Sequence, residues 1–179
     1  MRTEDLETGA TYLVGADGHL RLNTAGADVE ARYQEVLAQH QALAACWTGA
    51  CLARLFRQHA WLDAVTLSFS VTAEYDDSGG YYRCVRCHAE TVRAVPGTVL
   101  DDAIFPGGEF DADHAAELIR EEIEDDEFDL YTGLAGTPDG YEDLDLPLER
   151  SAVAELLSRE AIDGRSACAA WGLPQASPS

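Results

Sequence analysis

The feature that most constrains the fold is an uninterrupted alternation of apolar and polar side chains over Val65–Tyr75. Odd positions carry Val, Leu, Phe, Val, Ala and Tyr, while even positions carry Thr, Ser, Ser, Thr and Glu. Because successive side chains of a strand point to opposite faces, this period of two predicts a strand with one buried face.

The turn-forming residues 76–80 follow this strand, and the apolar pattern resumes in 81–95. We therefore expect an antiparallel hairpin over about 64–95. The register that places apolar side chains beside each other pairs Tyr75 with Tyr81, Val71 with Val85, Phe69 with Cys87, and Leu67 with Ala89. A smaller hairpin is predicted at about 11–22, where the turn-forming residues 15–18 separate two short apolar runs.

Helical periodicity fills most of the remaining chain. Asp28 is the predicted N-cap of a long N-terminal helix, in which Gly49 is a potential kink. Its expected buried face consists of Val29, Tyr33, Val36, Leu37, Leu43, Ala44, Trp47, Cys51 and Leu55. Further helices are expected from Asp111 to about Asp126, from Pro147 onward, and around 167–171, with a loop over 133–140.

These elements predict an α+β fold. An antiparallel sheet built from the hairpins at about 11–22 and 64–95 packs against the long N-terminal helix and two or three C-terminal helices. We expect residues 1–173 to form a single globular domain, because this length buries a sizeable core. Residues 174–179 are expected to be a disordered tail.

The charge balance excludes several functions. The chain has 33 acidic and 12 basic residues, a net charge of −21, which argues against direct nucleic-acid binding and against an anionic membrane. All 12 basic residues are arginine, so a Walker A lysine and a Schiff-base lysine are both excluded. The first ten residues are polar and acidic, unlike a secretory leader, so we expect a cytoplasmic protein with reduced thiols. We also expect no cofactor.

The run Cys84-Val85-Arg86-Cys87-His88 matches the attachment signature of a c-type haem. The motif falls inside the predicted second strand, where residues three apart point to opposite faces. Cys87 should therefore point inward, whereas Cys84 and His88 should point outward with Arg86. We interpret the motif as one core cysteine, one surface cysteine and a chance histidine.

The negative charge is concentrated in one segment. Residues 101–149 contain 18 acidic residues and a single arginine, Arg120, which gives a net charge of −17. Apolar residues interrupt this acidic segment throughout, so we expect it to be folded. Like charges four apart, such as Glu117 and Glu121, oppose helix formation locally, and such a conflict marks a candidate functional surface.

The leading hypothesis is a non-enzymatic protein that docks on a basic, nucleic-acid-binding partner and inhibits it, by analogy with DNA-mimic anti-restriction and anti-CRISPR proteins. Electrostatic steering would speed its association. The expected binding residues are Glu117, Glu121, Glu122, Glu124, Asp125, Asp126 and Asp129, with Tyr131 and Tyr141 as aromatic anchors.

Two alternatives remain open from the sequence. One is an immunity protein or antitoxin that neutralises a basic toxin. The other is a metal-dependent hydrolase that uses carboxylates and a histidine to hold a divalent ion. Its candidate residues are Asp101, Asp102, Glu109, Asp111 and His114. The pairs Asp111/Asp113 and Asp143/Asp145 are also weak calcium-ligand candidates.

Overall fold

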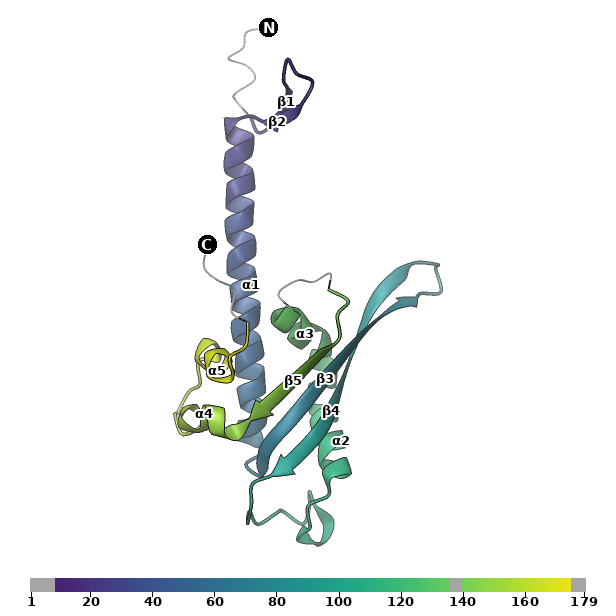
Figure 1. The fold of residues 1–179 in the computed structure, drawn as a ribbon, viewed down its shortest axis with the longest axis vertical. Helices are drawn as coiled ribbons and strands as arrows, with labels where there is room; N and C mark the ends of the chain where they lie inside the picture. The colour runs from purple at the N-terminus through teal and green to yellow at the C-terminus, as the bar shows by residue number, and fades with distance from the viewer. Residues whose placement is uncertain (1–8, 136–139, 175–179) are drawn as a thin grey trace. The chain divides into compact units, whose positions relative to one another are not determined.

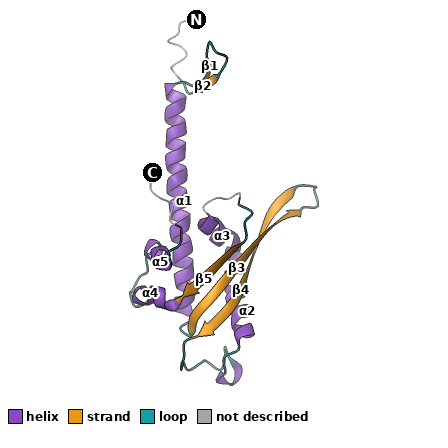
Figure 2. Cartoon of the chain, in the orientation of Figure 1, coloured by secondary structure: helices purple, strands orange, loops and turns teal. Residues whose placement is uncertain are grey.

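The computed structural model describes residues 9–135 and 140–174, whose helices and strands are shown in Figures 1 and 2. These residues fall into two compact units, 9–42 and 43–135 together with 140–174. The long helix α1 (Thr24–Gln58) contributes residues to both units. The α+β class is confirmed. None of the described helices is long and apolar enough to cross a membrane. The tail predicted at 174–179 lies, apart from its first residue, outside the described residues.

The first unit contains a hairpin and the first part of α1. Strands β1 (Tyr12–Val14) and β2 (Leu20–Leu22) pair antiparallel, as the sequence predicts. Asn23 joins this hairpin to the helix, because its side-chain oxygen accepts from the backbone N–H groups of Gly26 and Thr11 at 2.8 and 3.1 Å. Asparagine is a favoured N-cap residue, and α1 begins directly after it. The prediction that Asp28 caps this helix was therefore wrong.

The predicted buried face of α1 is buried only in its second part. Cys51 and Leu55 are 7% and 2% exposed, whereas Val29, Tyr33 and Val36 are 55–59% exposed. Leu43 and Trp47 are exposed as well. The expected burial of this first part was wrong, because a helical period identifies the apolar face but not the element that covers it.

The second unit is built on a three-stranded antiparallel sheet with the order β4-β3-β5. Strands β3 (Leu62–Tyr75) and β4 (Tyr81–Ala94) form the predicted long hairpin. All four predicted pairs are present: Tyr75 with Tyr81, Val71 with Val85, Phe69 with Cys87, and Leu67 with Ala89. The alternating pattern therefore determined both the strand and its register.

The third strand, β5 (Leu144–Glu149), contradicts the helix predicted from Pro147. Pro147 lies opposite Thr66 in this edge strand, a position that tolerates a residue without a backbone N–H. The helix α4 (Arg150–Leu157) begins only after the strand. Leu146 and Leu148, the buried residues of β5, share its core-facing side.

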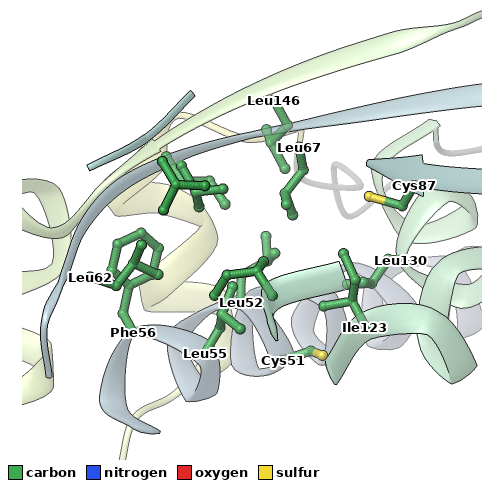
Figure 3. Close-up of a cluster of buried hydrophobic side chains, with 14 of the residues drawn as sticks. Cys51, Leu52, Leu55, Phe56, Leu62, Leu67, Cys87, Ile123, Leu130 and Leu146 are labelled. Carbon is green, nitrogen blue, oxygen red and sulfur yellow. The ribbon is translucent and has the colours of Figure 1, made fainter. Parts of the chain in front are cut away.

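One face of the sheet packs on helices and forms the core. Figure 3 shows Leu67 and Leu146 of the sheet pointing toward Leu52 of α1 and toward Ile123 and Leu130. Ile123 ends helix α2 (Ala112–Ile123), and Leu130 belongs to helix α3 (Glu127–Ala135). The core thus joins the second part of α1 to the acidic segment.

The acidic segment contains more elements than the single predicted helix. Asp111 caps α2 as expected, because its carboxylate accepts from the N–H groups of Asp113 and His114. The helix then passes through a 3-10 turn, η3 (Glu124–Asp126), into α3. Residues 133–135 of the predicted loop belong to α3, and 136–139 lie outside the described residues. An earlier 3-10 turn, η2 (Pro106–Gly108), precedes α2.

Helix α5 (Gly164–Trp171) packs closely on α1. A Cβ atom at Gly49 would overlap the backbone oxygen of Gly164 and the Cys168 sulfur. Ala53 of α1 also clusters with Val153 of α4 and Ala167 of α5. Helix α1 runs unbroken through Gly49. This glycine therefore allows α1 and α5 to approach closely and does not split the helix.

Candidate partner-binding face

Seven predicted binding carboxylates lie on the consecutive elements α2, η3 and α3. We call this set the acidic face, and it consists of Glu117, Glu121, Glu122, Glu124, Asp125, Asp126 and Asp129. Five of them are exposed, and Glu122 and Asp126 are partly buried. Buried residues of the same helices, including Ile119, Ile123 and Leu130, hold this surface on the core. Its carboxylates are therefore carried by folded, packed helices.

Arg120 neutralises part of the acidic face from within α2. Its guanidinium donates two hydrogen bonds to Glu117, at 2.7 and 3.0 Å, and lies 3.5 Å from a carboxylate oxygen of Glu124. The hydrogen bond from Arg120 holds the pKa of Glu117 below its ordinary value. Arg120 therefore contacts two carboxylates of the acidic face.

Two basic side chains of the α1 region engage further carboxylates. Arg54 donates to Asp126 at 3.1 Å, and the His59 ring contacts the Glu122 carboxylate. The Cys51 thiol also lies 3.6 Å from Asp126. These partners are 63 to 75 residues apart in the chain, so no local sequence signal could have identified them. They hold η3 and the end of α2 against α1.

Three carboxylates of the acidic face remain free of ion pairs and hydrogen bonds to the described residues: Glu121, Asp125 and Asp129. All three are exposed. Asp129 lies in the first turn of α3, where the helix dipole favours a negative charge.

The two predicted aromatic anchors lie in different environments. Tyr131 is 1% exposed, packs in the core and donates its hydroxyl to the Glu142 carbonyl at 2.7 Å. It therefore does not belong to the surface. Tyr141 is 56% exposed. Phe128, which the sequence reasoning missed, is 47% exposed on α3, and the Arg83 guanidinium lies 4.7 Å from its ring centre.

Four of the five residues suspected of metal-dependent hydrolysis form hydrogen bonds within the local structure. Asp101 and Asp102 accept backbone N–H groups of Ala103 and Gly107, and Asp111 caps α2. The His114 ring contacts the carbonyl of Ile104. Across 9–135 and 140–174, no three His, Cys, Asp or Glu side chains are grouped to hold a metal ion. Of the calcium candidates, Asp143 accepts from the Val71 N–H and Asp145 from the Ser68 hydroxyl.

The cysteine motif lies in β4 as predicted. Cys87 is 1% exposed and belongs to the core, and its strand neighbours Arg86 and His88 are exposed. Cys84 is also buried, at 8% exposure, so its expected place on the surface was wrong. Alternation along the strand separates Cys87 from Cys84 and His88, which prevents the three from converging on one group.

Comparison of the chain with family models, with curated proteins and with solved structures found no match to any of the three.

Proposed function

We propose that this chain is a non-enzymatic binding protein whose acidic face docks on the basic surface of a nucleic-acid-binding protein and blocks it. The observation that carries the proposal is the exposure of Glu121, Asp125 and Asp129, free of ion pairs within the described residues, on helices packed against the core. Carboxylates held in place on a folded surface can occupy positions in a cleft that binds phosphates. These carboxylates do not have to break an ion pair within the described residues before they bind a partner. They can therefore accept hydrogen bonds from its arginine or lysine side chains directly.

The ion pairs of the other acids support a positioning role. Arg54, His59 and Arg120 hold Asp126, Glu122, Glu117 and Glu124 in place, with α2 and η3 fixed against α1. A surface that is preorganised in this way loses little conformational entropy when it binds. Seven carboxylates against two guanidinium groups and one imidazole leave the acidic face strongly negative.

The experiment compares wild-type protein with two triple variants. In the first, Glu121→Arg, Asp125→Arg and Asp129→Arg reverse the free carboxylates. In the control, Asp77→Arg, Glu155→Arg and Glu160→Arg make the same charge change at exposed positions elsewhere. Each protein is used to capture partners from the native host, and the captured partner is purified and titrated at several NaCl concentrations.

We expect wild type and control to capture the same basic, nucleic-acid-binding protein, with affinity falling as salt rises. The first triple variant should fail to capture this partner. It should also fail to block the partner from binding nucleic acid. Equal capture by both triple variants, or binding that is insensitive to salt, would contradict the proposal.

A further inference from the structure

The first unit exposes most of its apolar side chains. Three of them belong to the hairpin and three to α1: Tyr12, Val14, Leu20, Val29, Tyr33 and Val36, each between 55% and 70% exposed. The only buried residues in 9–42 are Gly15, Asn23 and Gly26. This unit therefore lacks an apolar core of its own within the described residues.

The exposed side chains are ordered on both elements. On α1, Val29, Tyr33, Val36 and His40 follow one another at steps of four, three and four residues. This spacing places them in one stripe and is the a/d pattern of a two-helix coiled coil. In the hairpin, Val14 pairs with Leu20 and Tyr12 with Leu22, which puts these apolar side chains on one side of the ribbon.

Such elements need a cover to be stable. A two-stranded hairpin is marginal in water, and a helix gains most of its stability from packing an apolar face. Burying six side chains of this size removes on the order of 500 Å² from each copy. Two copies together would bury about 1,000 Å², which reaches the lower range of specific protein interfaces.

The charge distribution favours a second copy of this chain as the partner that covers these apolar side chains. The stripe contains no carboxylate or guanidinium group, and 9–42 hold four acids and two arginines. The acidic segment 101–149 has a net charge of −17, whereas residues 9–42 have a net charge of only −2, so electrostatic repulsion between two copies of the first unit is small. A heptad stripe is also complementary to itself under two-fold symmetry.

We propose that the first unit is a homodimerisation module, in which the stripe Val29–His40 and the apolar side of the β1–β2 hairpin are covered by the same surfaces of a second copy. This inference is independent of the proposed function, because it uses another unit of the chain and another kind of interaction.

The test measures the mass of the full-length protein in solution by sedimentation equilibrium over a range of concentrations. Wild type should be a dimer that dissociates on dilution. The variant with Tyr33→Glu and Val36→Glu should raise the dissociation constant at least about 100-fold, because each charge replaces a buried apolar side chain. The control Ala31→Glu, on the opposite side of α1, should leave the dimer intact.

Three further comparisons keep the test decisive. The combined fluorescence of Trp47, Trp61 and Trp171, which all belong to the second unit, should be the same in all three proteins if that unit stays folded. A milder variant, Val36→Ala, should weaken the dimer in the same direction without a new charge. Added NaCl should preserve or strengthen the dimer, the opposite of its expected effect on the acidic face.

A wild-type protein that remains monomeric at 100 µM would overturn the inference. So would a dimer that both stripe variants leave unchanged, or one lost equally in Ala31→Glu.

Discussion

The carboxylate of Glu127 accepts a hydrogen bond from the backbone N–H of Cys87, at 3.2 Å. Strand β4 pairs only with β3, so the outer edge of β4 has no strand neighbour to accept its N–H groups. Glu127 is 6% exposed at the start of α3 and provides that acceptor from a side chain. One residue of the acidic segment is therefore structural: it ties α3 to the sheet edge.

Replacing Glu127 with Ala should lower the free energy of unfolding by about 1–3 kcal/mol, because the buried Cys87 N–H loses this acceptor. Glu127→Gln keeps an oxygen in the same place and should cost less. Urea unfolding followed by circular dichroism measures both. Equal losses in the two variants would show that the charge, with Arg86 at 3.7 Å, matters more than the hydrogen bond.

Burial protects two thiols of the core from ionisation. Burial, with a smaller contribution from Glu127, raises the pKa of Cys87 to about 12, and burial raises the pKa of Cys51 to about 11. In the unfolded chain both thiols ionise near 9.0. Between pH 9 and these values the unfolded state has lost protons that the folded state keeps, so stability should fall with rising pH.

The expected slope is up to about 1.4 kcal/mol per pH unit for each thiol. Urea unfolding at pH 8, 9 and 10 checks it, with Cys87→Ala as the matched variant. The alkaline loss should be smaller in that variant than in wild type. If Cys87→Ala leaves the slope of the unfolding free energy against pH unchanged, groups other than the Cys87 thiol cause the alkaline loss of stability.

The sequence predicted the β3–β4 hairpin and the register of its four stated pairs, because alternation is a local property. Val71 opposite Val85 and Phe69 opposite Cys87 follow from matching apolar positions across a short turn. Asp111 was recognised as a cap for the same reason, since a cap acts within three residues.

What the sequence could not predict depends on distant partners. The predicted apolar face of α1 runs through both parts of the helix, yet only Cys51 and Leu55 of that face are buried. The segment around Pro147 resembled a helix start, and its pairing with Thr66 of β3 makes it a strand. In the acidic face, the residues that contact Asp126 and Glu122 come from the α1 region, more than 60 positions away.

The close approach of α1 and α5 predicts an unusual effect for Gly49→Ala. Alanine is the better helix former by about 1 kcal/mol, so an open site would be stabilised. Here the new Cβ overlaps the Gly164 backbone oxygen and the Cys168 sulfur, and overpacking of this kind costs about 1–3 kcal/mol. We expect a lower thermal midpoint, measured by calorimetry. An unchanged or higher midpoint would mean that α5 moves away from α1 at little cost.

Arg54 links stability to the charge of the acidic face. Its guanidinium is half exposed and lies 3.1 Å from Asp126, so the pair contributes less than about 1 kcal/mol to folding. Arg54→Gln removes the cation and leaves Asp126 free to meet a basic partner. The partner of the acidic face should then bind about two- to five-fold more tightly at low salt, and the gain should vanish at high salt. Arg165→Gln makes the same charge change on α5 and should alter affinity less. Titration of the purified partner against wild type and both variants at 50 and 500 mM NaCl measures this. Unchanged binding by Arg54→Gln would place Asp126 outside the interface, and weaker binding would show that the positioning of Asp126 by Arg54 outweighs the charge that it neutralises.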